Sequence, residues 1–333
     1  MKKYFCMVLL FISWLGVANS QPQPEKPSFA KEPRSGVLLL AHGGHVQTWN
    51  EEVRHVADQV DLFIPTEVAF GMASKSTMQE GINRLIARGV TNIVAVPLFV
   101  SSHSSVIDSS AYLLGLRAQA PAELRDFAAM DHAMRHGNMA HDSSLNHQAV
   151  ATNNPAATAD QLKPITSSVP IRMTSALDHD EIVGDILTDR AASISTDPSH
   201  EVVVLVAHGP VSEDDNKLWL DDMNLIANQM RKHVFYAGIA CITLRDDADD
   251  PVRNAATQQL RQLVKSIRQA GDTPLVVPLL LSYGGIETGL RKRLAGLDFK
   301  MPTEALLPDA RIATWVLAQV KASHTNSHNQ GQL

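Results

Sequence analysis

The sequence predicts an α/β protein made of two similar flavodoxin-like lobes, each with a parallel sheet covered by helices. Three observations support this prediction. Apolar segments without polar alternation, such as "GVLLLA" at 36–41, are typical of strands buried on both faces. These segments alternate along the chain with stretches of helical periodicity. The same order then occurs again, and the apolar run at 202–207 ends in His208 as the first run ends in His42.

The pattern of the first copy predicts three strands separated by two helices. The strand at 36–42 leads into an amphipathic helix over 48–63, because apolar residues recur there at helical spacing. These apolar residues are Trp49, Val53, Val56 and Val60. A strand at 65–70, a second amphipathic helix ended by Gly89, and a fully apolar strand at 92–100 complete the copy. Alternation of apolar strands with helices predicts a parallel sheet.

The second copy repeats this order after its own first strand. Its further elements are a helix at 217–230, a strand at 235–244, a helix at 254–271 and a strand at 274–282. Corresponding pairs in the two copies are His42 and His208, Trp49 and Trp219, and His103 and Gly284. The second copy therefore keeps one of the two strand-end histidines of the first copy and lacks the other.

The N-terminus predicts export. Residues 1–20 contain two lysines, a short apolar stretch and a small-residue cleavage site, as in a secretory signal. A retained N-terminal anchor is the alternative. A Pro-rich linker follows at 21–35, and no later segment reaches the roughly 18 apolar residues of a membrane helix. We therefore expect a periplasmic or secreted protein with no membrane span after signal removal.

The repeat sets the expected domain boundaries. The N-terminal lobe covers 36–197, the C-terminal lobe covers 198–322, and residues 323–333 form a polar tail expected to be disordered. The first lobe carries a polar insertion at about 115–168, expected to hold one or two weak helices at most. Its histidines are His132, His136, His141 and His147. They could gather metal ions, or the insertion could be a variable polar loop.

Composition excludes several classes of partner and cofactor. A formal charge of -6 without a long basic run argues against nucleic acid as a partner. No glycine-rich phosphate loop is present, so no nucleotide is expected. Cys6 leaves with the signal, and Cys241 lies in an apolar stretch, so no intramolecular disulfide is expected in the mature chain. The chain could be a monomer or a homo-oligomer.

His42 and His103 are the strongest candidates for chemistry. If the strand order is 2-1-3-4, the first and third strands are neighbours at the point where ligands bind in open α/β sheets. Two histidines distant in sequence would then face one crevice. Imidazole binds divalent metals and takes up protons near neutral pH. The pair predicts a metal site or an acid/base pair; the alternative is that each ring bonds a backbone carbonyl at its strand end.

The segments "LLLAHGG" at 38–44, "TEVAF…VPLFVSSH" at 66–103 and "IRMTSALDHDEIVGDILTDRA" at 171–191 together resemble the CbiX-type sirohydrochlorin chelatases, a branch of the class II chelatases. The resemblance extends over both copies. It implies a lyase that inserts cobalt, or iron or nickel, as a substrate metal into a tetrapyrrole held between two lobes. By position it implies that His42 and His103 bind the metal and help to remove the pyrrole protons.

Further site residues are ranked below this pair. His45 could be a third metal ligand, or a solvent-facing loop residue. Glu67 resembles an acidic position of the family and could assist proton removal, or it could only pair with a nearby cation. The basic run of Arg291, Lys292 and Arg293 could bind the substrate's carboxylates, or it could be an ordinary solvated helix face.

The sequence also departs from the family. Ser101 and Ser102 stand where glycines often precede the second histidine, and Gly284 replaces the histidine in the second copy. His208 is therefore expected to be structural, and the second lobe to form the opposite wall of the cleft. Sirohydrochlorin, the substrate that the resemblance implies, is made in the cytoplasm, whereas this chain is expected to be exported. A non-catalytic periplasmic metal- or tetrapyrrole-binding carrier is therefore the alternative function. A scaffold without ligand is the third.

Overall fold

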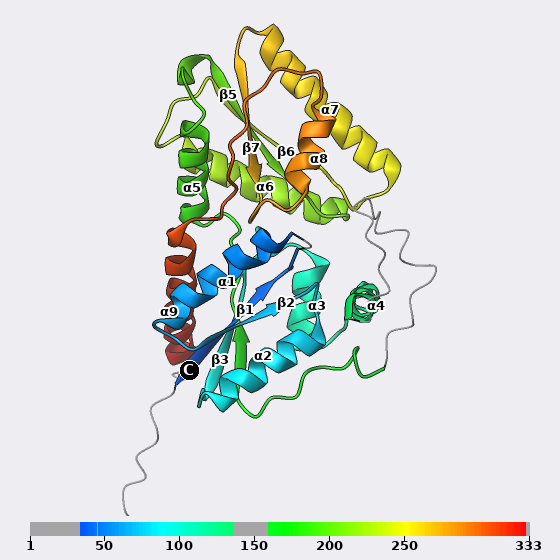
Figure 1. Cartoon of the computed structure of the whole chain (residues 1–333), viewed down its shortest axis with the longest axis vertical. Coiled ribbons are helices and arrows are strands. Elements are labelled where there is room, and N and C mark those ends of the chain that lie inside the picture. The colour runs from blue at the N-terminus through cyan, green and yellow to red at the C-terminus, as the bar shows by residue number, and fades with distance from the viewer. Residues whose placement is uncertain (1–33, 45, 136–158, 331–333) are drawn as a thin grey trace, which may run out of the picture. The chain divides into compact units, whose positions relative to one another are not determined.

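The computed structural model describes residues 34–44, 46–135 and 159–330, and Figure 1 shows its elements. The first half contains a four-stranded parallel sheet in the order β2-β1-β3-β4. Its strands are β1 (Ser35–Ala41), β2 (Thr66–Phe70), β3 (Asn92–Pro97) and β4 (Ile171–Met173). The predicted parallel sheet is thus confirmed, and it has the strand order 2-1-3-4 that was assumed when His42 and His103 were placed at one crevice.

The second half contains a three-stranded parallel sheet in the order β6-β5-β7. Its strands are β5 (Glu201–Ala207), β6 (Gly238–Thr243) and β7 (Thr273–Leu279). This order equals that of the first three strands of the first half, so the duplicated α/β architecture predicted from the sequence is confirmed.

Helices alternate with these strands. They are α1 (Gln47–Asp61), α2 (Lys75–Ala87), α3 (Ser105–Leu113), α4 (Leu124–Arg135), α5 (Glu181–Ala192), α6 (Glu213–Met230), α7 (Asp250–Gln269), α8 (Ile286–Arg293) and α9 (Ala310–Gln330). Four of them match the helices predicted from periodicity: α1, α2, α6 and α7. The buried residues of α1 are the predicted apolar stripe together with Ala57. Ser74 caps the N-terminus of α2, because its side chain accepts a hydrogen bond from the Thr77 backbone N–H.

Strand β1 is buried on both faces, which explains its unbroken apolar sequence. Leu38 and Leu40 belong to a hydrophobic cluster on one face, while Val37 and Leu39 belong to a different cluster. The cluster that contains Val37 and Leu39 also contains Leu205 of β5, so the two halves share a continuous buried core.

The closing helix of each half packs on the other half. Helix α5 contacts α6 and β7, whereas α9 contacts α1 and β3. Arg190 of α5 reinforces this exchange by donating hydrogen bonds to the backbone oxygens of Ala305 and Pro308 at 2.7 and 2.9 Å. The lobe boundaries predicted from the repeat divide the chain at residue 197. They do not predict that each closing helix packs on the other half. The exchange ties the two halves together through regular secondary structure.

Helix α9 continues to Gln330, although the sequence predicted disorder from residue 323. His324 Nε2 lies 2.8 Å from Ser35 Oγ, so this part of α9 is attached to the start of β1. The polar composition of the tail concealed this helix, because its apolar positions end near Val320.

Both ends of the predicted insertion belong to the first lobe. Leu124 and Phe127 of α4 are buried in the cluster beneath α2, and the Ile165 N–H donates to the Leu113 oxygen at 2.7 Å. The described part of the insertion contains one helix, α4. His136, His141 and His147 lie outside the described residues, as do the predicted signal segment and most of the linker.

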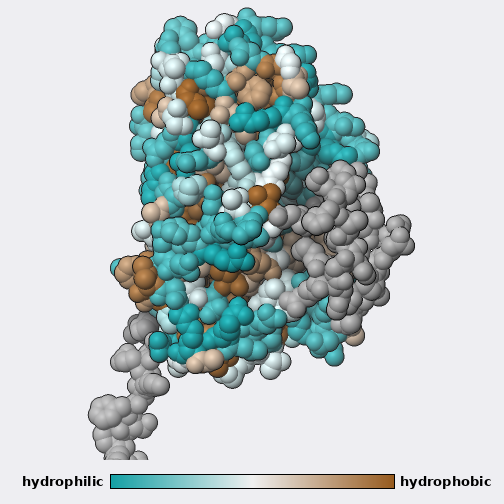
Figure 2. Space-filling model, in the orientation of Figure 1, coloured by the Kyte–Doolittle hydropathy of each residue, from teal (hydrophilic) through white to brown (hydrophobic). Residues whose placement is uncertain are grey.

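Across residues 34–44, 46–135 and 159–330, no helix is long and apolar enough to cross a membrane. The face drawn in Figure 2 is mostly hydrophilic, with hydrophobic residues in separate spots. The most exposed large hydrophobic side chains of the described residues are Leu62, Phe63 and Phe235. Each of them follows the end of a helix, where such scattered exposure is ordinary.

Candidate functional site

His42 is the first residue after β1, where the chain leaves the sheet. Its ring is exposed and lies edge-on to Trp49, with 6.5 Å between the ring centroids. Its Nδ1 lies 2.5 Å from the Gly43 carbonyl oxygen, which accepts the ring proton and places the lone pair on Nε2. Gly43 has a φ of +78°, a conformation that favours glycine, so the sequence after the histidine fixes this turn.

The glycine loop is tied to the start of α1. The Gly44 N–H donates to Asn50 Oδ1 at 2.9 Å, and Asn50 Nδ2 donates back to the Gly44 oxygen at 2.7 Å. A Cβ at Gly44 would lie 3.3 Å from the Trp49 side chain. Glycine therefore lets the loop pack against α1 and leaves His42 at the rim of the sheet.

His103 lies on the loop between β3 and α3, and its side chain is 36% exposed. Its backbone N–H donates to Ser101 Oγ at 3.1 Å. The neighbouring Ser102 donates to Asp178 from its N–H at 2.6 Å and from its hydroxyl at 2.8 Å. The serines that depart from the family pattern thus hold this loop through hydrogen bonds that glycines could make only in part.

The sheet brings both histidines to the same edge. Leu40 pairs with Pro97 in the parallel register of β1 and β3. His42 follows this pair by two residues and His103 by six, so both leave the carboxyl edge of adjacent strands. Joint binding of one cation stays a prediction, because the described residues contain no group of three or more His, Cys, Asp or Glu arranged to hold a metal ion.

The loop at the corresponding place in the second half is held by a buried arginine. His208 follows β5, donates from Nδ1 to the Gly209 oxygen at 3.0 Å and lies 3.5 Å from Asp247. Buried Arg245 donates to the backbone oxygens of Pro210 and Val211, both at 2.7 Å, and clamps the loop after His208.

Gly284 stands where the first copy has His103. A Cβ at Gly284 would lie 3.1 Å from Cδ1 of Trp49, so a larger side chain here would crowd that indole. The absence of a second histidine here and the Arg245 contacts agree with the expected structural role of His208.

Glu67 has cationic partners. Its carboxylate lies 2.7 Å from Arg84 Nε and 3.3 Å from Arg88 Nη1. Glu67 pairs in register with Leu38, four residues before His42. Glu67 therefore pairs with nearby cations, which was the alternative to proton removal, and no contact joins it to His42 among the described residues.

The basic run on α8 divides into two parts. Arg293 pairs with Asp246 and is only partly exposed, whereas Arg291 and Lys292 are exposed. The exposed pair is available to carboxylates in solution, and Arg293 is committed to the fold. His45 lies outside the described residues.

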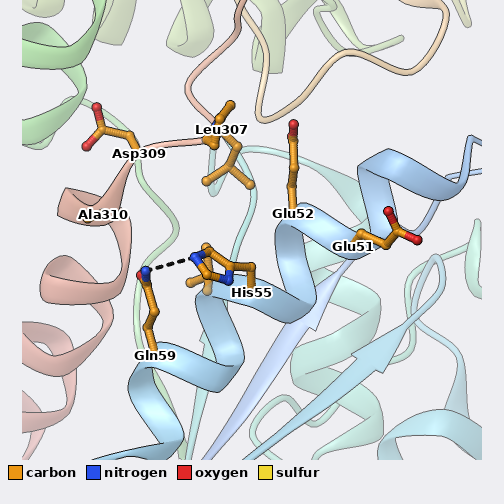
Figure 3. A pocket seen from close by; sticks show the side chains of 9 residues that line it. Glu51, Glu52, His55, Gln59, Leu307, Asp309 and Ala310 are labelled. Carbon is orange, nitrogen blue, oxygen red and sulfur yellow. Dashed lines mark hydrogen bonds between the residues drawn. The ribbon is translucent and has the colours of Figure 1, made fainter.

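A pocket of about 520 Å³ lies between α1 and residues 307–310, and none of the predicted site residues lines it. Figure 3 shows His55 and Gln59 of α1 there, joined by a hydrogen bond of 3.0 Å. Glu52, also in the lining, accepts a hydrogen bond from Ser282. The volume of this pocket therefore does not identify the functional site. The site is inferred instead from the position of His42 and His103 at the strand ends.

Sequence reasoning missed three residues around His103. Trp219 and Asp222 contact His103 from the other half, and His179 contacts Asp222. The repeat contained a usable signal, because Asp222 follows Trp219 by three residues as Glu52 follows Trp49.

Comparison with known proteins links the chain to the chelatases. A model of the CbiX protein family matches residues 36–194. A curated sirohydrochlorin cobaltochelatase from Methanothermobacter thermautotrophicus is 31% identical over 88 residues, which is 26% of this chain and 62% of that protein. Another from Sulfolobus acidocaldarius is 31% identical over 68 residues, 20% of this chain and 55% of that protein. The chain thus spans less than two thirds of the length of these relatives.

Solved structures share the fold of both halves. SirB from Bacillus subtilis with Fe3+ aligns with a TM-score of 0.58 at 18% identity, covering 89% of this chain and 98% of that one. The sirohydrochlorin chelatase SirB from Bacillus subtilis subspecies spizizenii in complex with cobalt aligns with a TM-score of 0.52 at 15% identity, with the same coverage. At these identities the likeness establishes the fold.

Proposed function

We propose that the protein is a metal chelatase that inserts a divalent metal into sirohydrochlorin or a related tetrapyrrole, because a model of the CbiX family matches residues 36–194. The observation that carries the proposal is the position of His42 and His103 at the carboxyl edge of adjacent strands. Cobalt is the first candidate metal, since the curated relatives are named cobaltochelatases; iron and nickel are the others.

The two imidazoles supply what the reaction needs. Metal insertion replaces two pyrrole N–H protons by one divalent cation, and the metal keeps its oxidation state, so acceptors for two protons are required. Neutral imidazole binds a first-row divalent cation through its lone pair and accepts protons near neutral pH. His42 and His103 hold the substrate metal toward the ring nitrogens and take up protons as the metal leaves them.

Turnover is the test of this proposal. Mature protein is incubated with sirohydrochlorin and Co2+, Fe2+ or Ni2+, and the absorption spectrum of the macrocycle is followed. We expect many equivalents of metallated product per protein. A change that stops at one equivalent would contradict catalysis and identify the carrier, the second candidate, which is favoured by the predicted export segment at 1–20.

We propose in addition a periplasmic or secreted location, supported by the lysines, short apolar stretch and small residues of 1–20. Expression of the full chain in a Gram-negative host should yield a periplasmic protein that begins after about Ser20. N-terminal sequencing of the cell fractions checks this. A cytoplasmic protein that retains Met1 would contradict it.

The insertion is expected to be dispensable for metal supply. Its described ends are anchored, since Phe127 is buried and Ile165 bonds to Leu113, so a deletion must spare them. We predict that replacing residues 137–157 by a short Gly-Ser linker leaves the initial metallation rate unchanged at limiting Co2+. The measurement compares deleted and full-length protein over a Co2+ series. A higher Co2+ concentration for half-maximal rate in the deleted protein would instead indicate delivery by this segment.

A further inference from the structure

The His103 loop is held by the other half of the molecule. Trp219 Nε1 of α6 donates to the backbone oxygen of His103 at 2.7 Å. Asp222, one turn further along α6, places Oδ2 3.5 Å from His103 Nε2. One helix face of the second half therefore contacts both the backbone and the ring of a proposed metal-binding residue.

One carboxylate oxygen of Asp222 is buried and needs a hydrogen-bond donor. Its side chain is 14% exposed, and Oδ1 accepts a hydrogen bond from His179 Nδ1 at 2.6 Å. Oδ2 is buried and has no hydrogen-bond partner within the described part of the chain. An unsatisfied buried carboxylate oxygen is costly, and His103 Nε2 is the ring nitrogen that faces it. A small rotation of the His103 ring would satisfy this oxygen.

We infer that Asp222 is a positioning residue that accepts the Nε2 proton of His103 and so leaves Nδ1 of His103 to bind the substrate metal. The inference rests on the proposed function. A neutral imidazole has one N–H and one lone pair, so the acceptor of the proton decides which nitrogen meets the metal. Carboxylates commonly orient metal-binding histidines in this way. His179 supports the same carboxylate from its other oxygen.

The repeat supplies a matched control. Glu52 follows Trp49 as Asp222 follows Trp219, and Glu52 accepts a hydrogen bond from Ser282 in the other half. Trp49 packs beside Gly284, which has no ring to orient. The two acids therefore share a place in the repeat and a contact between halves, but only Asp222 faces a histidine.

The test uses the full mature chain without metal, labelled with 15N in its histidines. We expect a hydrogen-bonded Nε2–H signal of His103, assigned by its absence in His103→Gln. Asp222→Leu should abolish this signal and weaken Co2+ binding, measured by calorimetry, roughly 10- to 100-fold. Glu52→Leu should leave both the signal and the affinity unchanged. Asp222→Ala is the second variant, in case the larger side chain prevents folding.

Two results would overturn the inference: a retained His103 Nε2–H signal with wild-type Co2+ affinity in the Asp222 variants, or equal losses in the Asp222 and Glu52 variants. Failure of the proposed function has a different signature. In that case His103→Gln itself would bind Co2+ and metallate sirohydrochlorin as the wild type does, whatever the Nε2–H signal shows.

Discussion

Replacing both His42 and His103 by alanine is expected to lower the rate of metal insertion at least about 100-fold. The double variant loses both lone pairs proposed to hold the substrate metal and both acceptors for pyrrole protons. His42 is exposed and His103 is half-buried, so the fold should tolerate the change. Initial rates of sirohydrochlorin metallation with Co2+ provide the measurement.

His208→Ala is the matched control for this experiment. His208 also follows the first strand of its lobe, but Arg245 clamps its loop and Gly284 replaces its partner. We expect the control to retain most of the activity. An active double variant together with an inactive His208→Ala variant would contradict this expectation, because the reactive lobe would then be the second one.

Replacing Glu201 by glutamine is expected to destabilise the protein by about 3 kcal/mol at neutral pH. The Glu201 side chain is 2% exposed at the start of β5. It accepts hydrogen bonds from Ser195 Oγ, from the Thr196 N–H at 3.0 Å and from Lys300 Nζ at 3.0 Å. Burial alone would raise its pKa, but these partners outweigh burial and lower the pKa to about 2.

The pH dependence follows from the direction of this shift. Because the pKa of Glu201 is lower in the folded protein than its ordinary value of 4.5, its contribution to stability is complete above about pH 4.5. The contribution is lost as the pH falls toward 2. The difference in unfolding free energy between wild type and Glu201→Gln, measured by urea denaturation, should therefore shrink over this range.

Asp221→Asn serves as the control for Glu201. Asp221 pairs with Lys217 on the exposed surface of α6, and such pairs contribute little. We expect a change within about 0.5 kcal/mol at every pH. A Glu201 variant as stable as this control at neutral pH would contradict the role assigned to the buried carboxylate.

The sequence predicted the parts of the fold that depend on local pattern. Strand β1 could be recognised because both of its faces are buried, as in Leu38 and Leu39. Helix α1 could be recognised because Val53 and Val56 recur on its buried face. The positions of His42 and His103 followed from the strand order, since adjacent parallel strands end at one edge of a sheet.

Contacts between distant segments could not be predicted in this way. The packing of α5 on α6 and of α9 on α1 joins residues far apart in the chain, and helical periodicity does not specify which sheet a helix covers. Asp222 was missed for the same reason, because its contact with His103 crosses between the halves. Glu67 illustrates the reverse case, in which a resemblance suggested proton transfer and the three-dimensional contacts show Arg84 and Arg88.

The most direct test of the account is a crystal of the mature protein soaked with Co2+ and measured at the cobalt absorption edge. We expect one strong anomalous peak at the carboxyl edge of β1 and β3, about 2.0–2.2 Å from one ring nitrogen of each of His42 and His103. A cobalt ion bound beside His208 with His42 and His103 vacant, or bound to only one of the two, would contradict the central claim that these imidazoles share a single cation.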